Sequence, residues 1–346
     1  MNAITIGVDL AKSVFQVHGE DAKGQIVFQK KLRRGQVEAF FAKHPRCVVA
    51  MEACGSAHHW GRTVAALGHE VRLIPAAYVK PFVRRNKTDA RDAAAICAAT
   101  GRPDMRTVAL KSVAQQAMRS VERGRELLVK QQTQLTNCVR GLLTELGIVA
   151  AQGRRGFAEL RALVETGDAR VPELLAATLR ELMRQLDSLA KGIAELEARI
   201  VATAKQDPAM RRLCTIPGVG VLTAHAIVAA IGDGRRFDTA RDFAAWAGLT
   251  PRESSSGGKT TKLGITRQGE RRLRSLFALG ASTVMRNARA SEARATPWQR
   301  GILARRPVKV AVLAQAAKTA RIAWAVLVSG EAYRRPAEPQ AQAVAA

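Results

Sequence analysis

A run of leucines and isoleucines in the middle of the chain constrains its fold most, because the spacing between them alternates strictly between four and three residues. This spacing is the a/d seam of a coiled coil, and it requires a long helix with one continuous apolar stripe. A looser seam precedes it from Val121 to Leu146, so we expect two long helices. The strict seam consists of Leu175, Leu179, Leu182, Leu186, Leu189, Ile193, Leu196 and Ile200.

A break rich in glycine and arginine, from Gln152 to Gly156, separates the two seams. Two long helices joined there would form an antiparallel hairpin within one chain, or their seam would join two copies of the chain. Either arrangement makes residues 111–206 a helical coiled-coil region. Asp207-Pro208 ends this region, because proline interrupts a helix interior.

The N-terminal residues 1–110 follow a different pattern, in which short β-type runs alternate with helical ones. This pattern predicts an α/β domain with a mixed sheet. The expected strands are Ile4–Val8, Val14–His18, Ile26–Lys30, Cys47–Met51 and Glu70–Ile74. The expected helices lie near Val37–Ala42, His58–Leu67 and Thr88–Ala99.

Four carboxylates fall at special positions of this domain. Asp9 and Glu52 each end an apolar strand, so neighbouring strands would present both side chains at one edge of the sheet. Asp89 and Asp92 are three residues apart at the start of a helix that Thr88 would cap, and this spacing places them on one helical face. Clustered carboxylates repel one another unless cations neutralise them, and hard oxygen ligands suit Mg²⁺ or Mn²⁺.

Each of these acids also has an ordinary structural explanation. Asp9 suits a turn or a cap, Glu52 suits a solvated strand end, and acids in the first turn of a helix interact favourably with its dipole. The ordered set of a strand-end Asp, a strand-end Glu and a helical D-x-x-D favours a metal site.

The charge of the chain predicts its partner. The chain contains 55 Lys and Arg against 29 Asp and Glu, a net charge of +26. Such an excess repels itself in a compact fold, so a polyanion is expected, with nucleic acid first and an anionic membrane as the rival. Against the membrane, even the apolar stretch Val308–Val328 contains Lys309, Lys318 and Arg321.

Two further features predict the compartment. The N-terminus lacks a basic leader before an apolar segment, so no signal peptide is expected. The five cysteines are odd in number and contain no C-x-x-C pair, which disfavours a disulfide framework and a structural zinc site. We therefore expect a protein of the reducing cytoplasm.

The third region, residues 207–330, is expected to be mainly helical and begins with a glycine turn. Pro217-Gly218-Val219-Gly220 lies between two helical segments and is similar to a helix-hairpin-helix motif. In such a motif, backbone N–H groups at the turn and the helix N-terminus meet a nucleic-acid phosphate. A helix-breaking turn without a ligand is the alternative.

A stretch rich in serine and glycine, Gly248 to Lys259, is expected to be a surface loop. Its three consecutive serines, Ser254 to Ser256, lie among basic residues. A hydroxyl held among phosphate-binding cations is a plausible nucleophile for phosphoryl transfer, whereas a flexible loop beside nucleic acid is the plainer explanation. The tail, residues 331–346, is rich in Pro, Ala and Gln and is expected to be disordered.

These patterns together predict which residues contact phosphates. The candidates are basic residues near the acidic cluster or the serine stretch, together with the glycines of the turn. They are Lys12, Arg84, Arg85, Lys87, Gly218, Gly220, Arg252, Lys259, Arg267, Arg271 and Arg272.

Five segments in a fixed order give the chain a resemblance that covers nearly its whole length. The chain resembles the DEDD-type insertion-sequence transposases, a family that includes the Piv invertases. The segments are Gly7-Val8-Asp9-Leu10-Ala11-Lys12, Met51-Glu52-Ala53, Asn86-Lys87-Thr88-Asp89-Ala90-Arg91-Asp92-Ala93, Ile216-Pro217-Gly218-Val219-Gly220 and Ala247 to Lys259.

The resemblance implies an α/β N-terminal domain of the RNase H or RuvC type, a coiled-coil middle and a C-terminal transposase domain with a serine nucleophile. It places the metal-binding carboxylates at Asp9, Glu52, Asp89 and Asp92. Ser256, directly before the glycine pair, best matches the nucleophile, with Ser255 second. It further implies Mg²⁺, DNA and a homo-oligomer, a dimer or a tetramer. A structured guide RNA from the same element is a further expected partner. The resemblance also implies a bacterial cytoplasmic protein that is associated with the nucleoid.

Three other functions remain open from the sequence. A RuvC-like structure-specific endonuclease would use the same carboxylates with water as the nucleophile and would not need the serines. A site-specific DNA invertase would share the whole arrangement. A nucleic-acid-binding protein without catalysis would explain the charge and the coil but not the four acids.

Overall fold

The computed structural model describes residues 3–83 and 88–335. The chain divides into two compact units, Met1–Ala114 and Gln115–Ala346, so the long helices of the middle region share a unit with the C-terminal helices. The expected phosphate contacts Arg84, Arg85 and Lys87 lie outside the described residues, as does most of the expected disordered tail.

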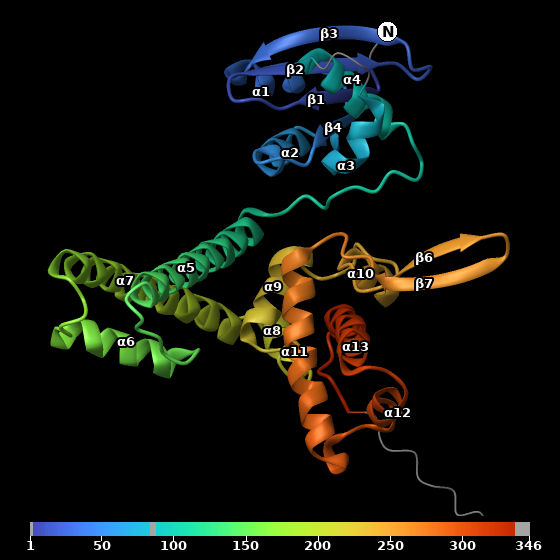
Figure 1. Ribbon diagram of the computed structural model, residues 1–346. Coiled ribbons are helices and arrows are strands. Elements are labelled where there is room, and N and C mark those ends of the chain that lie inside the picture. Colours follow the sequence, from blue (N-terminus) through green and yellow to red (C-terminus); the bar gives the residue numbers. More distant parts are fainter. Residues whose placement is uncertain (1–2, 84–87, 336–346) are drawn as a thin grey trace, which may run out of the picture. The chain divides into compact units, whose positions relative to one another are not determined.

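A five-stranded mixed sheet forms the first unit (Figure 1), which confirms the predicted α/β class. Its strand order is β3-β2-β1-β4-β5. The first three strands form an antiparallel meander, whereas β4 pairs in parallel with both β1 and β5. The strands are β1 (Thr5–Asp9), β2 (Val14–Glu20), β3 (Ile26–Arg33), β4 (Val48–Glu52) and β5 (Glu70–Ile74).

Helices cover both faces of this sheet. On one face, Ile6 and Val8 of β1 are buried in a core that includes residues of α1 (Val37–Lys43) and α2 (Ala57–Ala66). The opposite face is covered by α4 (Asp89–Thr100), whose alanines pack in a second core with Ala50 of β4. Shorter segments complete the unit: α3 (Ala76–Val79) and the 3-10 turns η1 (Arg34–Gln36) and η2 (Lys80–Phe82).

Gly7 allows α4 to approach the sheet closely. A Cβ atom at this position would overlap the carbonyl oxygen of Ala93 and lie 2.7 Å from the backbone nitrogen of Cys97. Any larger residue would therefore push α4 away from β1, and Asp9 is only two residues farther along that strand.

The second unit begins with three helices, α5 (Val113–Thr144), α6 (Arg154–Thr166) and α7 (Glu173–Gln206). Leu128 of α5 lies against Gly192 of α7, and Gly124, four residues earlier, faces Leu196, four residues later. The two long helices are therefore antiparallel, and Arg125 bonds Glu197 across them at 2.8 Å.

The strict leucine seam packs inside this chain. Every seam residue of α7 is buried or half-buried, and Leu179 shares a core with Val139 of α5 and Leu160 of α6. The expected connection between the long helices was wrong in one respect. The glycine- and arginine-rich break does not join them directly, because Gly153 precedes an additional helix, α6, that completes the core.

The remaining helices surround two apolar ones. In α9 every residue from Thr223 to Ile231 is buried, and α13 buries Ala311, Ala316, Ala320 and Ala323 completely. By length and composition alone, α13 could cross a membrane, but its packing among the other helices explains its apolar content. These helices are α8 (Pro208–Leu213), α9 (Val221–Ile231), α10 (Ala240–Trp246), α11 (Arg271–Ala290), α12 (Pro297–Arg305) and α13 (Val308–Ser329), with the 3-10 turn η3 (Glu292–Arg294).

The serine stretch is a β-hairpin and not the surface loop that we expected. Strands β6 (Pro251–Ser256) and β7 (Lys259–Ile265) extend from beside α10 (Figure 1). Gly257 and Gly258 form a two-residue turn with φ angles of 55° and 78°. A turn with two positive φ angles matches the twist of antiparallel strands, and glycine adopts it without strain.

Candidate functional site

The register of the sheet places two of the predicted carboxylates side by side. Val8 of β1 pairs with Met51 of β4, so the next residues, Asp9 and Glu52, end adjacent parallel strands. Side chains two residues apart on a strand share a face. Because Gly7 contacts α4 and Ala50 packs with its alanines, Asp9 and Glu52 extend from the α4 face of the sheet.

The start of α4 brings the other two acids to the same place. Thr88 caps the helix, since its side chain accepts a hydrogen bond from the backbone nitrogen of Arg91 at 3.4 Å. Asp89 and Asp92 lie in the first turn. Carboxylate oxygens of Asp9, Asp89 and Asp92 all lie within 4.8 Å of one another.

The structure thus gathers three of the four predicted ligands. Among the residues that the structure describes, Glu52 is not part of the tight group, although its strand ends beside Asp9. Three carboxylates so close together repel one another, and the positive end of the α4 dipole offsets part of this charge. Their all-oxygen donor set fits Mg²⁺ or Mn²⁺.

A second polar group lies under α4 and consists of His18, Glu20 and Cys97. It has the residue types of a metal site, but hydrogen bonds within the protein engage its histidine. The amide of Gln29 donates to Nδ1 of His18 at 3.1 Å, so the other ring nitrogen carries the proton and donates to Glu20 at 2.9 Å. Burial, together with the nearby Glu20 carboxylate, raises the pKa of Cys97 to about 12. A neutral thiol is a poor metal ligand, so we interpret this group as an anchor for α4.

The hairpin places its serines on two faces. Ser256 pairs directly with Lys259 and Ser254 with Thr261, so these four side chains lie on one face. Ser255 lies on the other face, where its hydroxyl donates to the Glu253 carboxylate at 3.3 Å. The register therefore separates Ser256, beside a cation, from Ser255, beside a carboxylate.

The base of the hairpin is held firmly while its tip is exposed. The Arg274 guanidinium donates to the carbonyl oxygens of Ala247 at 3.1 Å and Gln268 at 2.9 Å, on either side of the hairpin. Gly269 packs against the backbone of Trp246 so closely that a Cβ atom would overlap its carbonyl oxygen. Every residue of β6 is exposed, so the serines can meet a large substrate.

Most of the predicted phosphate contacts that the structure describes are accessible. The exposed residues are Lys12, Gly220, Arg252, Lys259, Arg267 and Arg271. Gly220 is the residue before α9, where free backbone N–H groups can meet an anion. Phosphate binding by these residues stays a prediction.

Two predicted contacts also have internal roles. Arg272 lies 3.1 Å from the Glu126 carboxylate and 3.5 Å from that of Glu122, with only 14% of its side chain exposed. Gly218 adopts a φ of 84° and packs against α11, where a Cβ atom would lie 2.9 Å from the carbonyl oxygen of Gly280. Both residues therefore stabilise the fold, and phosphate binding at this turn stays a prediction.

The sequence did not indicate the buried ion pair that holds Arg272. Glu122 of α5 accepts a hydrogen bond at 2.7 Å from Nδ1 of His225 in α9, and the side chains of both residues are 2% exposed. These positions are 103 residues apart in sequence, and no local pattern relates them. Their contact joins the long helices to the C-terminal core.

Known proteins share this arrangement of sequence. Residues 6–148 match a family described as "Transposase", of the DEDD type of IS110 elements. Residues 210–296 match the "Transposase IS116/IS110/IS902 family". The two matches cover the acidic cluster and the serine hairpin respectively.

Relatives that match nearly the whole chain are also described as transposases. The chain is 47% identical over 339 residues to a "Probable family 20 transposase" of Pseudomonas aeruginosa, covering 96% of this chain and 99% of the relative. It is 37% identical to the transposase for insertion sequence element IS1328 of Yersinia enterocolitica, covering 96% and 99%. It is also 38% identical to the transposase for insertion sequence element IS1111A of Coxiella burnetii, covering 95% and 91%.

Proposed function

The chain belongs to the IS116/IS110/IS902 family of DEDD transposases, and we propose that it cuts and rejoins DNA by metal-assisted serine attack to mobilise its own insertion sequence. The observation that carries the proposal is the gathering of Asp9, Asp89 and Asp92 at one end of the sheet, beside the strand end that carries Glu52.

The carboxylates would hold Mg²⁺, with Mn²⁺ as a substitute. When bound, a divalent cation neutralises charge on a scissile phosphate and polarises it for attack. Asp9 is fixed by β1, whereas Asp89 and Asp92 are fixed by the capped start of α4. Glu52 would join them from β4, and Lys12, in the loop after Asp9, would contact the DNA backbone.

The serine would supply the nucleophile. Oγ of Ser256 would form a bond to phosphorus, and the bond from phosphorus to the leaving oxygen would break and release a free DNA hydroxyl. Lys259, on the same face of the hairpin, would stabilise negative charge on the phosphoryl oxygens. Attack by a DNA hydroxyl on the phosphoserine reverses the step, so rejoining needs no external energy source.

The large positive charge suits two nucleic-acid partners. A transposase binds DNA, and we propose that a structured RNA from the same element also binds and guides the choice of target. The net charge of +26 suits both partners, because each phosphate that a cation neutralises adds to the affinity for nucleic acid. We also propose a homo-oligomer, a dimer or a tetramer, that acts on bacterial DNA in the cytoplasm.

The proposal is tested by sequencing recombination junctions in cells that carry the complete element. Wild-type protein should yield precise junctions, whereas Asp92→Asn and Ser256→Ala should yield none. Asp104→Asn, which changes an exposed carboxylate outside the cluster, is the matched control and should recombine normally. Normal junctions with both site variants would refute the proposal.

A further inference from the structure

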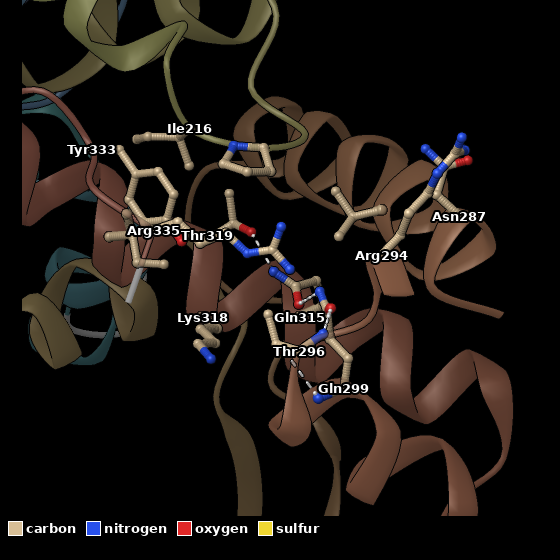
Figure 2. Close-up of a pocket in the computed structure, with 13 residues that line it drawn as sticks. Ile216, Asn287, Arg294, Thr296, Gln299, Gln315, Lys318, Thr319, Tyr333 and Arg335 are labelled. Atoms are coloured by element: carbon tan, nitrogen blue, oxygen red, sulfur yellow. Dashed lines mark hydrogen bonds between the residues drawn. The ribbon is translucent and has the colours of Figure 1, made fainter. Parts of the chain in front are cut away.

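A cavity of about 260 Å³ in the C-terminal helices is lined by polar groups that the proposed reaction does not use. It lies where α11, α12, α13, the turn before α9 and the segment after α13 meet (Figure 2). Pockets for drug-sized ligands usually measure about 300–1,000 Å³, so this cavity suits a smaller group.

One side of the cavity is a chain of buried hydrogen-bonding side chains. The Gln299 amide donates to Gln315 at 3.1 Å, and the Gln315 amide donates to the Thr319 hydroxyl, also at 3.1 Å. These residues are 7%, 6% and 2% exposed, respectively. Gln315 and Thr319 stand one turn apart on α13, a helix that is otherwise apolar on its buried side.

These buried side chains have more hydrogens to donate than the bonds between them use. The Gln315 amide has two hydrogens and the Thr319 hydroxyl has one, and the hydrogen bond between these side chains uses a single amide hydrogen. The remaining hydrogens of these buried groups can bond an acceptor that enters the cavity.

The rest of the lining is cationic and apolar. Lys318, Arg294 and Arg335 contribute positive charge, and no carboxylate lines the cavity among the described residues. Burial, followed by the neighbouring Arg321, lowers the pKa of Lys318, whose ammonium lies 4.4 Å from the centre of the Trp298 ring. An anionic ligand would interact favourably with this positive charge.

An aromatic residue stands at the opposite side from Arg294. Figure 2 shows Tyr333 beside Ile216, with Asn287 and Arg294 across the cavity. The backbone nitrogen of Tyr333 donates to the Thr215 hydroxyl at 2.9 Å, which holds the segment after α13 against the turn before α9. A flat ring held in this way can stack on a base.

We propose that this cavity binds one unpaired nucleotide of a nucleic-acid strand. The base would lie between Tyr333 and the Gln315–Thr319 donors, and its phosphate would meet one of the cations Lys318, Arg294 and Arg335. Amide and hydroxyl groups that reach a base edge, an aromatic surface and nearby cations are the three features by which proteins hold a base taken out of its stack. The inference rests on the proposed function, since a recombinase must open paired strands before they are exchanged.

The test measures binding of 5′-mononucleotides to the full-length protein by calorimetry, with no cleavage involved. The probes are dAMP, dGMP, dCMP, TMP, AMP and inorganic phosphate. Thr319→Val removes the hydroxyl while preserving shape, and Gln315→Met removes the amide. Thr203→Val, at a partly buried threonine of α7 far from the cavity in sequence, is the matched control. Thermal unfolding of each variant establishes that it is folded.

We expect wild-type protein to bind at least one mononucleotide more tightly than inorganic phosphate. Thr319→Val or Gln315→Met should weaken that binding by about tenfold, a change of about 1.4 kcal/mol, and Thr203→Val should not. Stronger binding of AMP than of dAMP would assign the nucleotide to an RNA strand, and the reverse preference to DNA.

No mononucleotide binding, or equal affinity for inorganic phosphate and every nucleotide, would overturn the inference. Unchanged binding in both pocket variants would also overturn it. The outcome is independent of the proposed reaction, because Ser256→Ala should abolish recombination and leave nucleotide binding intact. A wild-type protein that binds nucleotides but never recombines DNA would refute the proposed function alone.

Discussion

Ser256 and Lys259 form the closing pair of the β6–β7 hairpin, directly opposite each other across the Gly257-Gly258 turn. Because paired residues of an antiparallel ladder point to the same face, the lysine is the nearest cation in register with that serine. Ser255 faces the other way and bonds Glu253. The hairpin register thus favours Ser256 as the nucleophile and Lys259 as the group that stabilises the transition state.

Lys259→Ala is predicted to slow DNA strand cleavage by about 10²–10³-fold, the loss typical when one group that stabilises transition-state charge is removed. Lys262→Ala is the matched control, because Lys262 pairs with Glu253 on the opposite face. Single-turnover cleavage rates compare the two. Each variant should flatten the slope of log affinity against log salt by about one unit at most. Equal rates for both variants would contradict the assigned role.

Asp9→Asn, Asp89→Asn and Asp92→Asn are each predicted to abolish Mg²⁺-dependent cleavage while DNA binding is retained. The reason is that a neutral amide is a weaker ligand for a hard cation and removes charge from the group. Glu52→Gln should have the same effect if its side chain completes the site. The measurement is cleavage against Mg²⁺ and Mn²⁺ concentration, with band-shift assays for binding and Asp104→Asn as the control. Full activity in two of the cluster variants would reject the metal site.

The N-terminal sheet was predictable because its signals are local. Strand-end acids after Ile4–Val8 and Cys47–Met51 indicate an edge shared by neighbouring strands, and Thr88 indicates the helix start. The structure places these elements within a few residues of the expected positions. The sequence could not reveal that Asp9, Asp89 and Asp92 form a tighter group than the four acids together, because this depends on how closely α4 packs over Gly7.

Contacts between distant segments could not be predicted. The sequence suggests that Arg272 is a free cation, but it forms ion pairs with Glu122 and Glu126 of α5. Gly218 reads as a ligand-binding turn, yet its conformation serves close packing on Gly280. The serine stretch lacks the alternating apolar pattern of a buried strand, so its hairpin was missed, although the Gly257-Gly258 pair is a recognised turn signal.

The contact between Gly218 and Gly280 predicts a stability effect. A Cβ atom on Gly280 would overlap the carbonyl oxygen of Gly218, so Gly280→Ala should lower the free energy of unfolding by about 1–3 kcal/mol. The melting temperature should fall by about 2–4 °C for each kcal/mol.

Gly301→Ala is the control for this effect, since a Cβ atom on that α12 glycine meets nothing within 4 Å. It should leave stability unchanged or raise it by about 0.5–1 kcal/mol, because alanine is the better helix former. A melting temperature for Gly280→Ala equal to that of Gly301→Ala would show that the turn at Gly218 can shift without a loss of stability.

The buried ion pair predicts a second stability effect. Glu122→Gln removes the buried carboxylate that His225 and Arg272 share and leaves Arg272 only the exposed Glu126, and breaking a buried charge pair costs about 3–5 kcal/mol. Glu126→Gln removes a carboxylate whose side chain is 63% exposed, so its cost should stay below about 1 kcal/mol. Urea unfolding of both variants measures the difference. Equal midpoints would show that the buried pair contributes no more than the exposed one.

The central claim is that Ser256 forms a covalent bond to DNA, and a nicked suicide substrate tests it most directly. The substrate releases one strand after attack, so the linked intermediate accumulates, and a denaturing gel with peptide mapping locates the modified residue. The account predicts a protein–DNA adduct that maps to Ser256, persists in Ser255→Ala and is absent in Ser256→Ala. Efficient cleavage by wild-type protein with no adduct would contradict the account and favour water as the nucleophile.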